Sequence, residues 1–320
     1  MKPLVSRVLL ATDFSRCADL ALGYALAIAS WWKAELHVFH VLEFLPGMDP
    51  QYPVNKMYLD ELRKEATQHL NAIEKRAASA GISIRRTIEI GIPSQRIEAA
   101  AGDLNMDLIV MGMHGRTGLE HVLVGSTAER VVRTAPCPVL SVKGGRDERP
   151  HATAQAGSPG IRRLVIPIDF SASSLDALEY GVQFAKHLGA SVTILHVLEP
   201  VAYGLDFTLG RSAERREQKE HVQSKLKVLC ALCTSNGVNA DSVLKAGLPA
   251  DSIREYVDRE KPDLVIMGTH GRRGISRLLS GSVAEGMLRL ACCPVLAVRM
   301  PCFDPGHRRI MPGGDNNPAV

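Results

Sequence analysis

The sequence predicts two α/β domains in tandem, each built on a parallel β-sheet that helices cover on both faces. Two observations lead to this fold class. One long segment occurs twice along the chain, and inside each copy short apolar runs alternate with stretches of helical periodicity. Five β runs joined by helices are typical of a doubly wound sheet with right-handed crossovers. Such sheets bind ligands beyond the carboxyl ends of their strands, where the strand order reverses.

The two copies are related by a constant offset. Asp13 and Asp169 are 156 positions apart, and every other matched landmark is displaced by the same number. A constant displacement indicates that a whole domain was duplicated without net insertion. The matched pairs are ATDFS with PIDFS, HVLE with HVLE, GIPSQRI with GLPADSI, MDLIVMGMHGR with PDLVIMGTHGR, and CPVLSV with CPVLAV.

Within the first copy, each element follows from its local pattern. Short apolar runs predict strands, and apolar residues at helical spacing predict helices between them. Several of the strands are apolar on both faces, as a sheet covered by helices on two sides requires. The predicted strands are 6–13, 35–42, 82–90, 107–112 and 137–142, and the predicted helices are 16–32, 54–80, 93–104 and 126–134.

Composition marks where the domains end. Between the copies, KGGRDERPHATAQAGSPG is rich in Gly, Pro, Ala and charge, which is typical of a linker. The residues from Met300 onwards have no periodicity and contain much Pro, Gly and Asn. We therefore predict domains at 1–143 and 161–299, a linker at 144–160 and a disordered tail at 300–320.

The overall composition argues against several classes of protein. The net charge of +4 with dispersed Lys and Arg, and the aromatic content of 5%, argue against a nucleic-acid surface. The longest apolar stretch, from Leu20 to Trp32, is too short to span a bilayer and suits a buried helix. The N-terminus lacks a signal-peptide pattern, and the seven cysteines form no regular disulfide framework. We therefore expect a cytoplasmic protein with no membrane or nucleic-acid partner.

A glycine frame follows the fourth predicted strand. Gly112 and Gly115 lack a Cβ, so the backbone can turn sharply there and approach a bound group closely. Nine residues later Gly125 precedes Ser126, which forms a capping-box pattern with Glu129 and predicts the start of a helix. A helix N-terminus presents free N–H groups to a phosphate. The pattern therefore predicts a phosphate held between the glycine turn and the helix; alternatively, the glycines only shape a turn and a helix entry.

The frame Gly-x-x-Gly, nine residues, Gly-Ser, after a strand ending in Met-Gly and with an Asp closing the first strand, resembles the universal stress protein family. The resemblance covers both halves and nearly all of the chain outside the linker and tail. Family members that carry the full motif bind ATP, and both halves keep every glycine and the following serine. The resemblance therefore implies a Rossmann-like sheet of strand order 3-2-1-4-5 in each half, with ATP as the ligand. Mg²⁺ is expected only because ATP normally carries it.

The resemblance also implies roles for single residues. In the first half, adenine would meet Asp13 and the backbone at Val41, the ribose and phosphates would lie against Met111 and Gly112, and the phosphates would be held by Gly115, Arg116, Gly125, Ser126 and Thr127. The matching positions of the second half are Asp169, Val197, Met267, Gly268, Gly271, Arg272, Gly281, Ser282 and Val283. Val283 stands where the first half has Thr127, so one hydroxyl is missing and the second site is expected to be weaker.

The two aspartates also have a physical interpretation of their own. A carboxylate at the end of a strand can accept a hydrogen bond from an adenine amino group or a ribose hydroxyl. The alternative is a structural role, because Asp13 and Ser15 both suit the entry to the next helix.

Other nucleotide chemistries lack their motifs. The chain has no Gly-Lys-Ser or Gly-Lys-Thr for a P-loop, and no G-x-G-x-x-G follows the first strand. His114 and His270 lie inside the glycine turns, where a lone histidine is more often a polar turn residue than a catalyst. Cys230 and Cys233 share a helix face without a second ligand pair, so we expect no metal site.

We therefore expect an ATP-binding sensor or regulator of the stress response, with no catalytic residues and at most slow ATP hydrolysis. The alternatives are a slow ATPase or phosphotransferase that uses a turn histidine, and a nucleotide-free interaction scaffold. The resemblance implies that the last strands, VLSV and VLAV, meet to form an internal pseudo-dimer. A homodimer of the whole chain is compatible with this arrangement, and the protein partner is not identified by the sequence.

Overall fold

The computed structural model describes residues 3–43, 51–113, 125–143, 160–199, 211–269 and 282–299. The chain divides into two compact units, Met1–Gly160 with Pro294–Ala297, and Ile161–Cys293 with Val298–Val320. Of the predicted linker, 144–160, only Gly160 is among the described residues. The predicted tail, 300–320, lies outside them.

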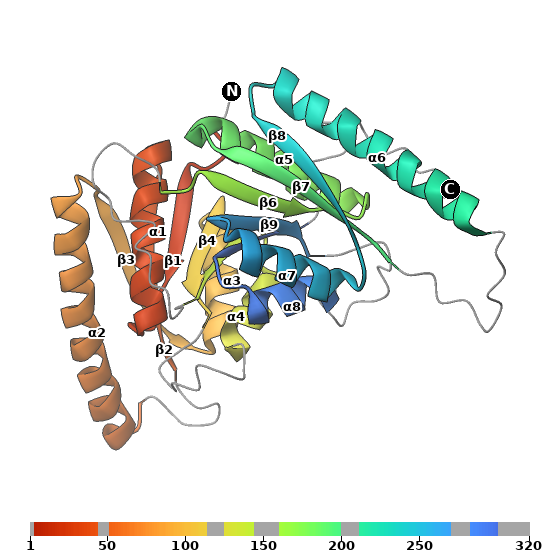
Figure 1. The fold of residues 1–320 in the computed structure, drawn as a ribbon. Helices are drawn as coiled ribbons and strands as arrows, with labels where there is room; N and C mark the ends of the chain where they lie inside the picture. Colours follow the sequence, from red (N-terminus) through yellow and green to blue (C-terminus); the bar gives the residue numbers. More distant parts are fainter. Residues whose placement is uncertain are drawn as a thin grey trace. The chain divides into compact units, whose positions relative to one another are not determined.

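The first unit is a parallel sheet with interleaved helices (Figure 1). Its strand order is β3-β2-β1-β4-β5, which confirms the predicted order 3-2-1-4-5. All of its strand pairs from β3 to β5 are parallel. Its elements are β1 (Arg7–Ala11), α1 (Arg16–Trp32), β2 (Glu35–Glu43), α2 (Pro53–Ser79), β3 (Ile84–Gly91), α3 (Pro93–Asp103), β4 (Leu108–Gly112), α4 (Ser126–Thr134) and β5 (Val139–Val142).

The second copy of the repeat has the same strand order, β8-β7-β6-β9-β10. The described pairs of β6 with β7, β6 with β9 and β7 with β8 are parallel, as in the first unit. Its elements are β6 (Arg163–Pro167), α5 (Ala172–Leu188), β7 (Ser191–Leu198), α6 (Arg211–Ser235), β8 (Ala240–Ala246), α7 (Pro249–Glu260), β9 (Leu264–Gly268), α8 (Ser282–Leu290) and β10 (Val295–Val298).

The helix boundaries lie close to those that the periodicity predicts. α1 and α4 have the predicted bounds, α2 begins and ends one residue earlier than predicted, and α3 ends one residue earlier. β1 is shorter than its apolar run, because Thr12 and Asp13 belong to the turn before α1. Asp13 therefore lies beyond the strand, so the alternation of side chains between the two faces of the sheet does not set its direction.

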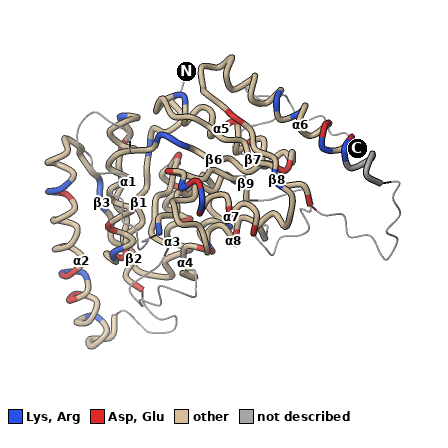
Figure 2. The backbone as a smooth tube through the Cα atoms, viewed as in Figure 1, with Lys and Arg blue, Asp and Glu red and all other residues tan. Residues whose placement is uncertain are grey.

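The core of the first unit lies between the sheet and its helices. Val8, Leu9 and Leu10 of β1 are fully buried, and most of α1 is buried along with them. α2 buries only a narrow stripe at helical spacing, which is Leu59, Ala66, Leu70 and Ala77. Basic and acidic residues are interspersed along the helix (Figure 2), which is typical of an amphipathic surface helix. Within the described segments, no helix is both long enough and apolar enough to cross a bilayer.

Candidate functional site

Asp13 and Val41, the residues predicted to contact adenine, both lie at the carboxyl ends of the central strands of the first sheet. Ala11 of β1 pairs with Phe39 of β2 on one side and with Met111 of β4 on the other. Asp13 and Val41 each lie two residues beyond this level. β1 and β4 are also the strands at which the order reverses, the position where doubly wound sheets bind ligands.

The second sheet has the same register. Pro167 of β6 pairs with Leu195 of β7, so Asp169 and Val197 again lie two residues beyond a paired level. Met111 and Met267 are buried, 5% and 4% exposed.

The turn after β1 resolves the choice between two helix caps. Ser15 is the N-cap of α1, and its side chain accepts the Ala18 N–H. Asp13 instead accepts the Ser15 N–H through Oδ1 at 3.0 Å, which closes a turn over Phe14. The aspartate is therefore oriented by the turn without being the helix cap.

Gly112 packs against the first turn of α1. A Cβ at this position would lie 2.9 Å from both the backbone nitrogen of Ala18 and the carbonyl carbon of Cys17. In the second unit, a Cβ on Gly268 would lie 2.7 Å from the carbonyl oxygen of Ser173 in α5. Both glycines are thus required by the approach of a strand end to a helix, whether or not a ligand is bound.

Gly125 places the start of α4 beside the end of β4. Its N–H donates to the carbonyl oxygen of Met113, the residue after β4, at 2.9 Å. It is also the N-cap, so the prediction that the capping box would place Ser126 at the cap was wrong by one residue. The Glu129 N–H donates to the Gly125 carbonyl, which makes Ser126 the first residue inside the helix.

The N-cap of α4 is a glycine, which has no side chain to accept a backbone N–H, in contrast to the serine cap of α1. The first N–H groups of an α-helix have no partner within the helix. At this end of the sheet, α4 therefore presents donors and the positive end of its dipole beside Gly112. Thr127 is half-buried here, and Val283 is half-buried at the matching place in α8.

The remaining predicted contacts lie outside the described residues. These are Gly115, Arg116, Gly271, Arg272 and Gly281, together with the turn histidines His114 and His270. Ser282 begins α8, as predicted for the residue after the third glycine of the frame. The structure therefore places the residues predicted to meet adenine and the start of α4 at the carboxyl end of the first sheet, while the nucleotide site itself stays a prediction.

Two histidines and a phenylalanine were not among the predicted contacts. Phe14, in the turn beside Asp13, has a φ of 61°, and its ring lies 4.3 Å from that of His40. His40 is buried in β2, and His196 is buried at the matching position of β7. The only sequence signal for Phe14 is its recurrence in the matched segments ATDFS and PIDFS.

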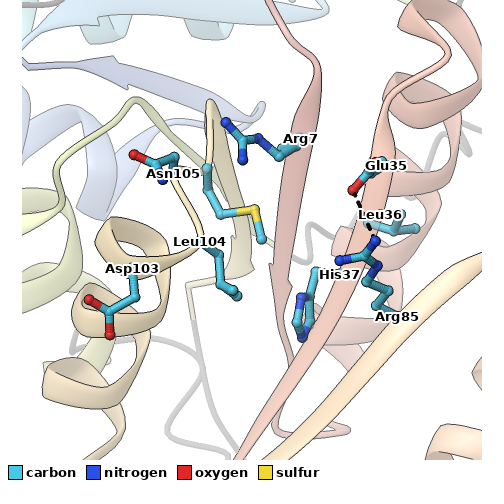
Figure 3. A pocket seen from close by; sticks show the side chains of 9 residues that line it. Arg7, Glu35, Leu36, His37, Arg85, Asp103, Leu104 and Asn105 are labelled. Carbon is cyan, nitrogen blue, oxygen red and sulfur yellow. Dashed lines mark ion pairs between the residues drawn. The ribbon is translucent and has the colours of Figure 1, made fainter.

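A cavity of about 220 Å³ lies at the opposite end of the first sheet, where its strands begin. Figure 3 shows Arg7, Glu35 and Arg85 around it, and these residues lie at the amino ends of β1, β2 and β3. Arg85 pairs with Glu35 at 3.9 Å, so the guanidinium and carboxylate partly offset each other. The cavity has no glycine frame and no helix N-terminus among its lining residues, and it is distinct from the predicted ATP site.

The described residues contain no group of three or more His, Cys, Asp or Glu side chains arranged to hold a metal ion. Cys230 and Cys233 are free thiols on α6. Burial raises the pKa of Cys233 to about 12, so this thiol is protonated at neutral pH.

A model of the universal stress protein family matches residues 5–143 and 160–299, which together make up most of the chain. The chain belongs to this family. A universal stress protein of Methanocaldococcus jannaschii is 35% identical over 141 residues, which cover 44% of this chain and 83% of that protein. A universal stress protein of Mycolicibacterium smegmatis is 24% identical over 295 residues, covering 91% of this chain and 96% of its own length.

A solved structure shares the fold over most of the chain. The crystal structure of a universal stress protein from Archaeoglobus fulgidus matches with a TM-score of 0.69 and 22% identity. The match covers 93% of this chain and 97% of that one. The tandem α/β arrangement of this universal stress protein is therefore shared with a protein of similar length.

Proposed function

We propose that each unit binds ATP at the carboxyl end of its sheet, and that the chain acts as a nucleotide-dependent regulator of the stress response. The observation that carries this proposal is the meeting of three elements in the first unit. Gly112 brings the end of β4 against the start of α1, and the glycine N-cap Gly125 brings the start of α4 against the end of β4. The N–H groups at the start of α4 and the carboxylate of Asp13 thus lie at the carboxyl end of the same sheet, which supports a site for a phosphate and a base.

Within this site the roles follow the chemistry of each group. Asp13 would accept a hydrogen bond from the adenine amino group beside the backbone of Val41. The backbone at Met111 and Gly112 would meet the ribose, and the start of α4 would receive the phosphates together with the glycine turn. Mg²⁺ would arrive with ATP as the partner of its phosphates. The second unit would use the matching positions, with Val283 in place of Thr127.

A regulator of this kind requires no catalytic residue. Bound ATP shifts a conformational or partner equilibrium only if it binds one state more tightly than the other. We therefore propose a switch that reads nucleotide occupancy, with ATP hydrolysis at most slow.

Titration calorimetry of the nucleotide-stripped chain tests the proposal. Two ATP should bind per chain, and the variants Gly115→Val and Gly271→Val should each lose one, because a branched side chain fills the turn. Gly102→Ala is a matched glycine control in α3 with no atom within 4 Å of the added Cβ, and it should bind two. Full binding by both valine variants would contradict the placement of the phosphates.

A nucleotide-free scaffold is the second candidate, and one observation favours it. Gly112 and Gly268 are both explained by packing against a helix, so their presence does not by itself require a ligand. If the unmodified chain binds no ATP in the same titration, the scaffold is the account to pursue.

A further inference from the structure

We propose that Phe14 in the first unit, and Phe170 in the second, are positioning residues that orient the carboxylate of the preceding aspartate towards the bound nucleotide. This role presupposes the ATP site proposed above, and it would explain why that site prefers adenine to other purine bases. Each phenylalanine lies in the turn between the first strand of its unit and the helix that follows.

Both phenylalanines adopt a left-handed backbone conformation. The φ angle is 61° at Phe14 and 62° at Phe170. Residues with a Cβ seldom adopt such angles, because the Cβ crowds a neighbouring carbonyl oxygen. Lys33 and Lys261 share the positive φ, but each caps the C-terminus of a helix, where this conformation is common. A bulky residue held this way before a helix indicates a turn that its surroundings keep in place.

Side chains from β2 and α2 hold the Phe14 ring. Its centroid lies 4.3 Å from that of His40 and 4.7 Å from that of His69, whose ring is nearly parallel at 19°. Nδ1 of His40 lies 2.7 Å from the carbonyl oxygen of Thr12, and because a carbonyl only accepts, this nitrogen donates. The ring stack thus joins the end of β1 to β2 and α2.

The second unit repeats the arrangement with one exchange. The Phe170 ring lies 4.9 Å from that of His196, whose Nδ1 lies 2.7 Å from the carbonyl oxygen of Ile168. Lys225 occupies the position that matches His69, and its Nζ lies 5.7 Å from the centre of the Phe170 ring, a cation–π distance. The two units therefore share the held turn, although one of the groups that hold it differs.

The held turn fixes the aspartate through a backbone hydrogen bond. The Ser15 N–H donates to Oδ1 of Asp13 at 3.0 Å. The Ser171 N–H donates to Oδ1 of Asp169 at 3.0 Å as well. These bonds form across the phenylalanine, so a turn that relaxed to a negative φ would release the carboxylate from its orientation.

An oriented carboxylate at this place discriminates between purine bases. It accepts a hydrogen bond from the 6-amino group of adenine, whereas hypoxanthine presents a carbonyl oxygen there and is repelled. A site built to bond one group rejects the analogue that lacks it, because its own polar atom is left unpaired. ATP and inosine triphosphate (ITP) therefore differ at the position that the aspartate reads.

Titration calorimetry with ATP and ITP tests this role. The Phe14→Leu/Phe170→Leu chain should lose about tenfold or more of the preference for ATP over ITP, the loss expected for a hydrogen bond to a charged group. The Asp13→Asn/Asp169→Asn chain should lose a similar factor. The chain with all four substitutions should lose no more than either pair, because the phenylalanines act through the aspartates. A Phe14→Tyr/Phe170→Tyr chain keeps the rings and should keep the preference.

Three results would overturn this role while leaving the ATP site intact. They are an unchanged preference in the leucine chain, losses that multiply in the fourfold variant, and loss of the preference in a tyrosine chain with a folded circular-dichroism spectrum. If the leucine chain fails to fold, the tyrosine chain decides alone. Binding of neither nucleotide by the unmodified chain would overturn the proposed function itself.

Discussion

Replacing Gly112 with alanine tests whether the approach of β4 to α1 requires a glycine. The added Cβ would lie 2.9 Å from the Ala18 nitrogen and from the carbonyl carbon and Cβ of Cys17. Two of these three are backbone atoms of a helix, which cannot rotate away as the end of a long side chain does. The strand or the helix must therefore shift, and overpacking of this kind lowers the free energy of unfolding by about 1 to 3 kcal/mol.

Gly102→Ala is the matched control, with the opposite sign expected. Gly102 lies in α3, and an added Cβ there has no heavy atom within 4 Å. Alanine is favoured over glycine in a helix by roughly 0.5 to 1 kcal/mol, so this variant should be more stable than the unmodified chain.

Urea unfolding followed by tryptophan fluorescence measures the stability change of both variants in the first unit, where both substitutions lie. The chain has two tryptophans, and both lie in α1, so their emission reports on the first unit. Without nucleotide, the midpoint should fall for Gly112→Ala and rise for Gly102→Ala at an unchanged slope. A Gly112→Ala chain as stable as the unmodified one would refute the packing argument and leave close approach of a ligand as the reason for the glycine.

Three further predictions concern single side chains. Burial lowers the pKa of His37 from 6.5, so the fold favours the neutral form and loses stability as the pH falls below about 6.5. His37→Gln should reduce the fall of the urea midpoint between about pH 7.5 and 5, and an unchanged dependence of the midpoint on pH would contradict this prediction. A hydrogen bond from Cys293 lowers the pKa of the exposed Cys292, whereas burial raises the pKa of Cys233 to about 12. Iodoacetamide should therefore label Cys292 well before Cys233, and peptide mass mapping that finds Cys233 labelled first would contradict this. Thr127→Val should weaken ATP binding at the first site about two- to tenfold in calorimetry by removing one hydroxyl, and an unchanged affinity would remove Thr127 from the site.

Local pattern was sufficient to predict the fold because strand and helix periods alternate clearly and the repeat confirms each assignment. α1, for example, begins after a serine cap and ends before Lys33, within a long apolar stretch that the sequence shows directly. The strand order required the resemblance, since local periodicity does not say which strands are neighbours.

The site was predicted less completely, because its geometry depends on tertiary packing. The sequence shows that Gly112 is a glycine but not that α1 lies against it. The capping-box pattern placed the cap at Ser126, whereas the bond between Gly125 and Met113 makes Gly125 the cap. The left-handed turn at Phe14 had no signal in residue preference, because a phenylalanine rarely adopts a positive φ.

Equilibrium dialysis of labelled ATP against the nucleotide-free chain tests the central claim, that each unit carries a nucleotide site, most directly. The account predicts two ATP bound per chain at saturation, with the second unit's site the weaker because Val283 replaces a threonine. Retention of no ATP at any concentration up to the millimolar range would contradict it.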